Sequence, residues 1–197
     1  MNEKPYQGYE LASRGRRLLA AIINGIIISV ITSSITQALG TSINFTDLLS
    51  IRTFKDFEEV LEAASDSNNI LINALVDISV CGLYGYLCYP HLKGTLGHRI
   101  LGMRVININR ATLTAKEGAI RELLKQAPFT LSDISAPLRL GISSLINLAA
   151  LIYSIWLLWD EDKQNVYDKI AKTYVVMDRE PLVLNDNNED NVVNDTI

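Results

Sequence analysis

Three stretches of the chain are almost purely apolar, and each is about as long as a membrane-spanning helix. They cover residues 18–39, 70–89 and 140–159. The first and third contain no Asp, Glu, Lys or Arg, and the second contains only Asp77. A helix of about 20 such residues, at roughly 1.5 Å per residue, crosses the hydrocarbon core of a bilayer. The pattern therefore predicts an all-α integral membrane protein with three spanning helices.

The overall composition alone does not separate a membrane protein from a soluble one. Hydrophobic residues make up 48% of the 197 residues and charged residues 20%. A large soluble helical core is the alternative, but soluble helices carry a polar stripe and these three stretches show almost none. The first stretch is longer than the apolar region of a secretory signal and lacks a small-x-small cleavage site. We therefore expect it to remain as an anchor.

Further elements are predicted from shorter patterns. Apolar residues at three- and four-residue steps over 47–63 predict an amphipathic helix on the outer membrane face or on the spanning helices. The moderately apolar segment 117–136 predicts a re-entrant or interfacial helix. Segments 103–108 and 173–177 have strand-like patterns and predict a tiny sheet on the cytoplasmic face. The Asn/Asp-rich residues 178–197 predict a disordered acidic tail.

Basic residues are distributed unevenly among the polar segments. Three arginines directly precede the first apolar stretch, lysines and arginines dominate 90–138, and acids dominate 40–69. By the positive-inside rule, the N-terminus and 90–138 lie in the cytoplasm and 40–69 lies outside. Three crossings would place the C-terminus outside, against the preference of the lysines that follow the third stretch. A helix within 117–136 would restore the parity, and we expect a cytoplasmic C-terminus.

The segment 94–105 reads GTLGHRILGMRV and combines glycines with basic side chains. Backbone N–H groups of such a loop can cradle a phosphate. The glycine spacing fits neither the P-loop nor the dinucleotide-binding fingerprint. The favoured interpretation is a turn or helix-packing element beside a membrane surface, with its arginines facing anionic headgroups.

Taken together, these landmarks resemble the RDD family of small bacterial membrane proteins, named for one arginine and two aspartates. Arg17 matches the arginine that opens the first motif, whereas Asn24 stands where the family has an aspartate. Segment 94–105 resembles the middle motif, with His98 where a lysine is commoner. The resemblance covers about residues 12–177, taken as the membrane domain.

The closing motif resembles residues 160–176, with Tyr167 where a histidine is frequent. The positions that match family motifs are Arg17, Asn24, Gly94, Thr95, Gly97, Gly102, Arg104, Arg121, Asp168 and Thr173. Guanidinium and carboxylate form a bidentate fork. We therefore expect Arg17 and Asp168 to pair and to pin the first helix to the C-terminal segment.

The resemblance implies a multi-pass protein of the bacterial cell membrane, and transport, including sodium/proton exchange, has been proposed for some members. Asn24 can hydrogen-bond but cannot titrate, which counts against exchange by the family route. Ionisable groups within a membrane are usually functional. Asp77 is therefore the candidate intramembrane site, with Asn73 and Asn147 beside a path that includes Asn24. The alternative is that Asp77 hydrogen-bonds Asn24 or hydroxyl groups of neighbouring helices.

Two functional hypotheses follow. The first is a transporter or transporter accessory subunit, working as a homo-oligomer because three or four helices barely enclose a pore. The second is a non-catalytic membrane scaffold that recruits a protein partner through its basic loop or acidic tail. An enzyme is not expected, because His91 and His98 are the only histidines and no catalytic arrangement, metal-ligand cluster or cofactor motif is evident. Nucleic-acid binding is not expected either, since topology explains the basic loop.

Overall fold

The computed structural model describes residues 6, 8–41, 52, 53, 55, 67–135 and 140–179. The predicted amphipathic helix over 47–63 lies almost entirely outside the described residues, as does the predicted tail from residue 180. The elements are α1 (Arg14–Ala38), α4 (Ser67–Leu92), α5 (Leu96–Ile100), β1 (Met103–Asn107), α6 (Ala115–Ile134), α7 (Leu140–Ile155), the 3-10 helix η1 (Trp156–Leu158), α8 (Val166–Ile170) and β2 (Thr173–Met177).

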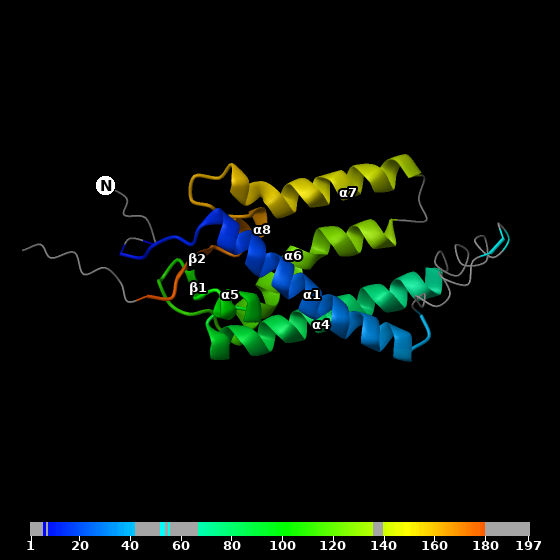
Figure 1. Cartoon of the computed structure of the whole chain (residues 1–197), viewed down its shortest axis with the longest axis horizontal. Coiled ribbons are helices and arrows are strands. Elements are labelled where there is room, and N and C mark those ends of the chain that lie inside the picture. The colour runs from blue at the N-terminus through cyan, green and yellow to red at the C-terminus, as the bar shows by residue number, and fades with distance from the viewer. Residues whose placement is uncertain are drawn as a thin grey trace, which may run out of the picture.

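The long helices run back and forth from one end of the molecule, where the small sheet lies. Helices α1 and α6 run away from the sheet, and α4 and α7 run back toward it (Figure 1). The residues before α1 return to the same end, because Leu11 forms an antiparallel bridge with Val176 of β2. The predicted extra helix therefore exists as α6 and runs alongside α4. This alternation of helix directions places the start of α1, both strands and the end of α7 at one end of the bundle.

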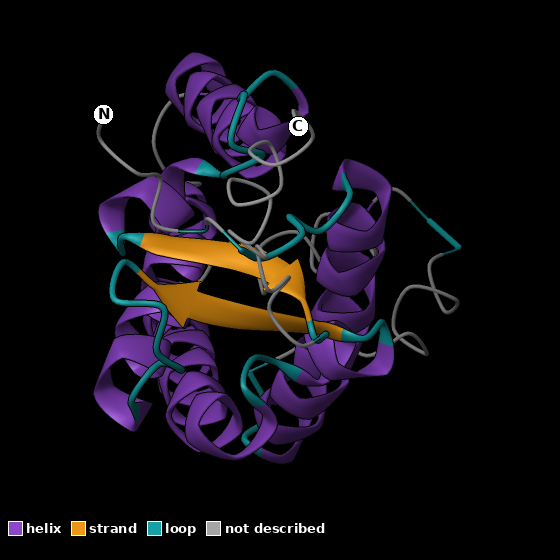
Figure 2. Cartoon of the chain, turned by 90° about the vertical axis from the view of Figure 1, so that its left-hand side faces the viewer, coloured by secondary structure: helices purple, strands orange, loops and turns teal. Residues whose placement is uncertain are grey.

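The predicted sheet is confirmed, one residue shorter in its first strand than expected. Strands β1 and β2 are antiparallel, with Met103 opposite Met177 and Asn107 opposite Thr173. Figure 2 shows the two strands lying across the ends of the helices. Buried side chains beneath them form the core at this end of the molecule. They are Ala12, Ala20, Tyr89, Met103, Val105, Leu113, Val175 and Met177.

Helices α4 and α6 approach each other unusually closely at a pair of glycines. A Cβ atom built on Gly85 would lie 2.5 Å from the carbonyl oxygen of Gly118, and one built on Gly118 would lie 2.6 Å from side-chain atoms of Tyr89. Only residues without a Cβ allow backbones to come this near. Small residues bring helices together in membranes, where the hydrophobic effect does not. The glycine pair thus fixes α6 against α4 close to the buried charged residues of α6.

Two helical stretches in the described part of the chain are long and apolar enough to cross a membrane, Arg14–Ala38 and Asn68–Ile100. Only 17% and 22% of the residues in their most apolar segments are buried, so these helices do not resemble the core of a soluble protein. The third predicted span is shorter than expected: α7 ends at Ile155, and the chain continues as η1. α6 has 20 residues but is too polar to be recognised by hydropathy.

Candidate functional site

Asp168 lies at the centre of a buried set of charges where α1, α6 and α8 meet. Its side chain is fully buried, and Arg17 binds its Oδ2 while Arg121 binds its Oδ1. The Asn165 backbone N–H donates to Oδ2 at 3.0 Å. The predicted Arg17–Asp168 pair is confirmed, but the predicted bidentate fork is wrong. Arg17 Nη2 donates to Asp168 Oδ2 and Arg17 Nη1 donates to the carbonyl oxygen of Lys163, while Arg121 binds Oδ1.

Burial by itself would raise the pKa of Asp168. The guanidinium groups of Arg121 and Arg17 outweigh that effect and lower the pKa to about 2. Asp168 is therefore a permanent carboxylate at neutral pH. It compensates two arginines that are 1% and 4% exposed in their side chains. Buried charges of this kind are tolerated only when paired and hydrogen-bonded.

Arg121 extends the set of charges along α6. Its Nε donates to Thr173 Oγ1 at 3.2 Å, its Nη1 donates to the Tyr89 hydroxyl, and its guanidinium lies 5.1 Å from the centre of the Tyr167 ring. Arg121 is thus held from every side by strand, helix and aromatic groups.

Glu122, the next residue of α6, completes the arrangement. It accepts from the Tyr89 hydroxyl at 2.8 Å and from Lys125 Nζ at 3.0 Å. We call Arg17, Arg121, Glu122, Lys125 and Asp168 the buried charge network. Sequence reasoning singled out Arg17, Arg121 and Asp168 but missed Glu122, Lys125 and Tyr89. The 122/125 spacing is the one signal that could have indicated an ion pair on a helix.

Asn24 and Thr95 connect α1 to the segment between α4 and α5. Asn24 Nδ2 donates to Thr95 Oγ1 at 2.6 Å, and Asn24 Oδ1 accepts from the Gly97 backbone N–H at 2.9 Å and from the Tyr84 hydroxyl at 3.0 Å. The amide thus uses both its donor and its acceptor, which no carboxylate could do. Asn24 is 1% exposed and points to α5, not to Asp77.

His98 completes this cluster as a neutral, buried side chain. Its Nδ1 lies 2.6 Å from Thr95 Oγ1. The Thr95 backbone N–H donates to the same Nδ1 at 3.4 Å, so Nδ1 is the acceptor and the proton lies on Nε2. Burial, followed by the positive charge of Arg121, lowers the pKa of His98 to about 3. Asn24, Tyr84, Thr95, Gly97 and His98 form what we call the Thr95 cluster.

Glycine occupies the three positions in segment 94–105 for different structural reasons. At Gly97 an added Cβ would lie 2.5 Å from the Ala20 carbonyl oxygen, so only glycine lets α5 pack against α1. At Gly94 it would lie 3.1 Å from His98 Cβ. Gly102 has φ +65°, the left-handed region that favours glycine. These roles fit the predicted packing element and give no phosphate cradle.

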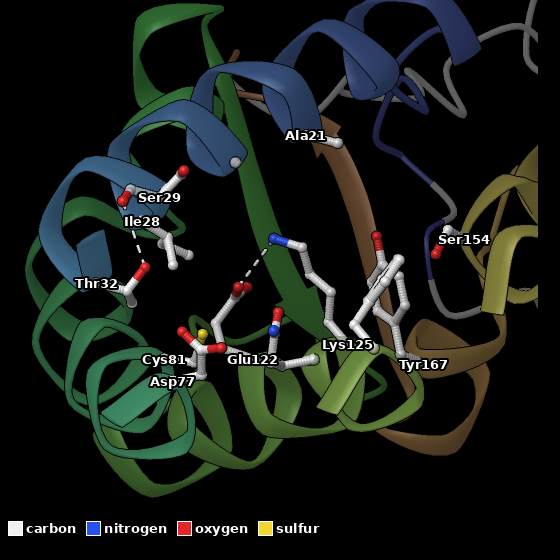
Figure 3. A pocket seen from close by; sticks show the side chains of 13 residues that line it. Ala21, Ile28, Ser29, Thr32, Asp77, Cys81, Glu122, Lys125, Ser154 and Tyr167 are labelled. Atoms are coloured by element: carbon white, nitrogen blue, oxygen red, sulfur yellow. Dashed lines mark hydrogen bonds and ion pairs between the residues drawn. The ribbon is translucent and has the colours of Figure 1, made fainter. Parts of the chain in front are cut away.

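Asp77 stands where two cavities between the helices adjoin. The larger, about 430 Å³, reaches Glu122 and Lys125, and we call it the Lys125 cavity. The smaller, about 260 Å³, reaches Asn73 and Asp133, and we call it the Asn73 cavity. Thr32 and Asp77 line both. In Figure 3, Asp77 and Cys81 lie on one side of the Lys125 cavity, and Lys125 pairs with Glu122 of the same helix, α6.

The predicted polar path is brought together only in part. Asn73 and Asp77 line the Asn73 cavity, and Asn73 also donates to the Thr41 carbonyl. Asp77 faces the Thr32 hydroxyl of α1, in line with the hydroxyl alternative. Asn24 lies in the Thr95 cluster, and Asn147 lies exposed on α7 and lines neither cavity. The path containing all four residues is therefore wrong.

The remaining predicted positions lie at the sheet. Arg104 is on β1, where its guanidinium is 4.9 Å from the centre of the Tyr9 ring. Thr173 begins β2 and accepts from Arg121. Among the described residues, no group of three His, Cys, Asp or Glu side chains is placed to hold a metal ion.

Comparison with known proteins places this architecture in a family. Neither a curated protein nor a solved structure matches the chain. The family model described as the RDD family matches residues 11–172. That range contains the buried charge network, the Thr95 cluster and both cavities. Family membership and the apolar helices together indicate association with a membrane. This chain belongs to the RDD family.

Proposed function

We propose that this protein is a multi-pass protein of the cell membrane, with its N-terminus in the cytoplasm, and that it transports a small cation or serves as a subunit of such a transporter. The path runs between α1, α4 and α6, through the Asn73 cavity and the Lys125 cavity. The observation that carries the proposal is the position of Asp77 on the shared wall of the two cavities.

Three acidic side chains follow this path in order. Asp133 lines the Asn73 cavity, Asp77 lines both cavities, and Glu122 lines the Lys125 cavity. Glu122 is already paired with Lys125. Among the described residues that line the Asn73 cavity, none beside Asp77 and Asp133 is basic. Unpaired carboxylates inside a membrane are costly and are retained where they handle ions or protons, which favours a cation over an anion.

Hydroxyl and amide groups supply the remaining polar lining. Ser29, Thr32 and Ser33 of α1 and Asn73 of α4 face the two cavities. Oxygen ligands of this kind replace the hydration shell of hard cations. The buried charge network joins α1, α6 and α8 at one end of the path, and its members Glu122 and Lys125 also line the Lys125 cavity.

The test is ion flux into liposomes that contain the purified full chain. We expect Asp77→Asn to lower cation flux at least tenfold, because the amide cannot compensate a cation. Glu10→Gln removes an exposed carboxylate outside the cavities and should leave flux unchanged. Equal flux in the wild type and Asp77→Asn, or none in either, would rule out transport and leave the scaffold hypothesis, for which a partner captured through segment 94–105 is the expected sign.

A further inference from the structure

Three basic side chains converge on a single carboxylate at the sheet end of the molecule. Asp178, the residue after β2, lies 2.9 Å from Arg99 Nη1, 3.7 Å from Arg104 Nη1 and 3.9 Å from Lys93 Nζ. The three cations come from α5, β1 and the turn after α4. One carboxylate therefore faces three positive charges, and two remain uncompensated within the group. We call Lys93, Arg99 and Arg104 the basic cluster.

The basic cluster is open on one side and closed on the other. The side chains of Lys93 and Arg99 are 47% and 57% exposed, whereas those of Arg104 and Asp178 are 18% and 19% exposed. Arg104 forms the floor, covered by the Tyr9 ring. Its Nε is buried and has no hydrogen-bond partner among the described residues. Buried donors are nearly always satisfied, so this floor has capacity for another acceptor.

Exposed apolar side chains lie on the same element as one member of the basic cluster. Leu96 and Ile100 of α5 are 37% and 64% exposed and lie on the same short helix as Arg99. This helix forms the C-terminal end of the stretch Asn68–Ile100, which is apolar enough to cross a membrane. Exposed aliphatic side chains next to lysine and arginine are the composition expected at the boundary between acyl chains and headgroups.

We propose that the basic cluster binds the phosphate of an anionic lipid headgroup and that Asp178 is an internal competitor for the same cations. Arginine forks match phosphate oxygens in pairs, and Lys93 adds a third charge at the rim. The flanking aliphatic residues favour a lipid phosphate over a free one. The inference does not depend on the transport proposal, since none of these residues lines either cavity.

The test measures binding of phosphatidylglycerol to the purified full chain in detergent, with phosphatidylcholine as the neutral lipid. We expect phosphatidylglycerol to bind more tightly. Arg99→Gln should weaken that binding about fivefold, which corresponds to ~1 kcal/mol for one basic residue near an anionic surface. Arg99 is exposed, so its loss leaves the fold intact. Lys116→Gln, an exposed basic residue outside the cluster, should have no effect.

The internal competitor gives the sharper result. Asp178→Asn should tighten phosphatidylglycerol binding severalfold. Glu161→Gln changes net charge by the same amount at an exposed position and should not. Equal affinity for the two lipids, or equal effects of Asp178→Asn and Glu161→Gln, would overturn the proposal. Displacement of the lipid by an equal concentration of inorganic phosphate would overturn the lipid assignment.

Discussion

Arg17 and Arg121 lie on different helices and bind opposite oxygens of the same buried carboxylate, that of Asp168. Among the described residues, the nearest other carboxylate to either arginine in an ion pair is Glu122, 3.3 Å from Arg121. One residue of a five-residue helix thus holds α1 and α6 together, in a region where the apolar faces of the helices give little specificity. The family motif residues Arg17, Arg121 and Asp168 are therefore explained as a structural joint.

Loss of this joint should be strongly destabilising. Arg17→Gln leaves Asp168 with one arginine, and Asp168→Asn removes the carboxylate from Arg17 and leaves Arg121 with Glu122 at 3.3 Å. Each should lower the free energy of unfolding by about 3–5 kcal/mol, measured by denaturant unfolding in detergent. Arg16→Gln is the matched control, since Arg16 is exposed in the same helical turn, and it should change stability by less than about 0.5 kcal/mol. Similar losses in Arg16→Gln and Arg17→Gln would contradict this role.

Gly97→Ala should separate α5 from α1. The new Cβ would lie 2.5 Å from the Ala20 carbonyl oxygen and 3.0 Å from Asn24 Cγ, so the backbone must shift and the Thr95 cluster must loosen. We expect a loss of about 1–3 kcal/mol, read from thermal unfolding. Gly15→Ala meets nothing within 4 Å and should be neutral or slightly stabilising. An equal response at both positions would exclude close packing as the reason for Gly97.

Because His98 is buried, the protein should become less stable as the pH falls below 6.5, the ordinary pKa of a histidine side chain. Its pKa is about 3 in the folded protein against 6.5 for the free side chain, so the unfolded chain binds the proton more strongly in that window. Stability is complete above pH 6.5 and should fall by about 1.5 kcal/mol between pH 6.5 and pH 5, at up to ~1.4 kcal/mol per pH unit. Unfolding curves across this range measure the slope.

A variant without the imidazole checks the assignment. His98→Gln should lose most of the dependence in that window. His91→Gln, which removes the other histidine from an exposed position, should retain it. If both variants keep the wild-type slope, His98 is not its source.

The architecture predicts which parts of the chain share one side of the membrane. Leu11 pairs with β2, and β2 pairs with β1, so residues 11, 110 and 178 must lie together. Accessibility tags at the N-terminus, residue 110 and residue 178 should report the cytoplasm, and a tag at residue 55 should report the outside. A tag at residue 178 on the side opposite to residue 110 would break the sheet and refute this topology.

The sequence predicts α1 and α4 well because most of their surface is exposed and apolar. Hydropathy does not identify α6 as a spanning helix, since it measures how polar a segment is and not where its side chains point. Arg121 and Glu122 are each 1% exposed and satisfied by groups inside the bundle. A helix that is polar toward its neighbours therefore resembles an interfacial segment when only its composition is known.

From the sequence, single pairs of interacting residues in the site can be predicted, but the whole arrangement cannot. A motif match suggests that Arg17 meets Asp168, but a carboxylate shared by two arginines depends on three elements whose spacing in space is not written in any one segment. Tyr89 is harder still, because it ends an apolar stretch and nothing in its neighbours marks its hydroxyl as a partner of Arg121 and Glu122. The predicted path through Asn24 is wrong because the sequence shows that Asn24 lies on α1 but not that its side chain points to α5 and away from Asp77.

The shared carboxylate also sets an order for assembly in the cell. Asp168 follows Arg17 by 151 residues and Arg121 by 47. At about 5–20 residues per second, Arg17 waits roughly 8–30 s after its own synthesis before its counter-charge exists. During that interval α1 is already held to earlier-made segments by contacts such as Asn24–Thr95, but Arg17 still lacks Asp168. The N-terminal end of α1 is therefore joined to α6 through Asp168 only after α8 has been made.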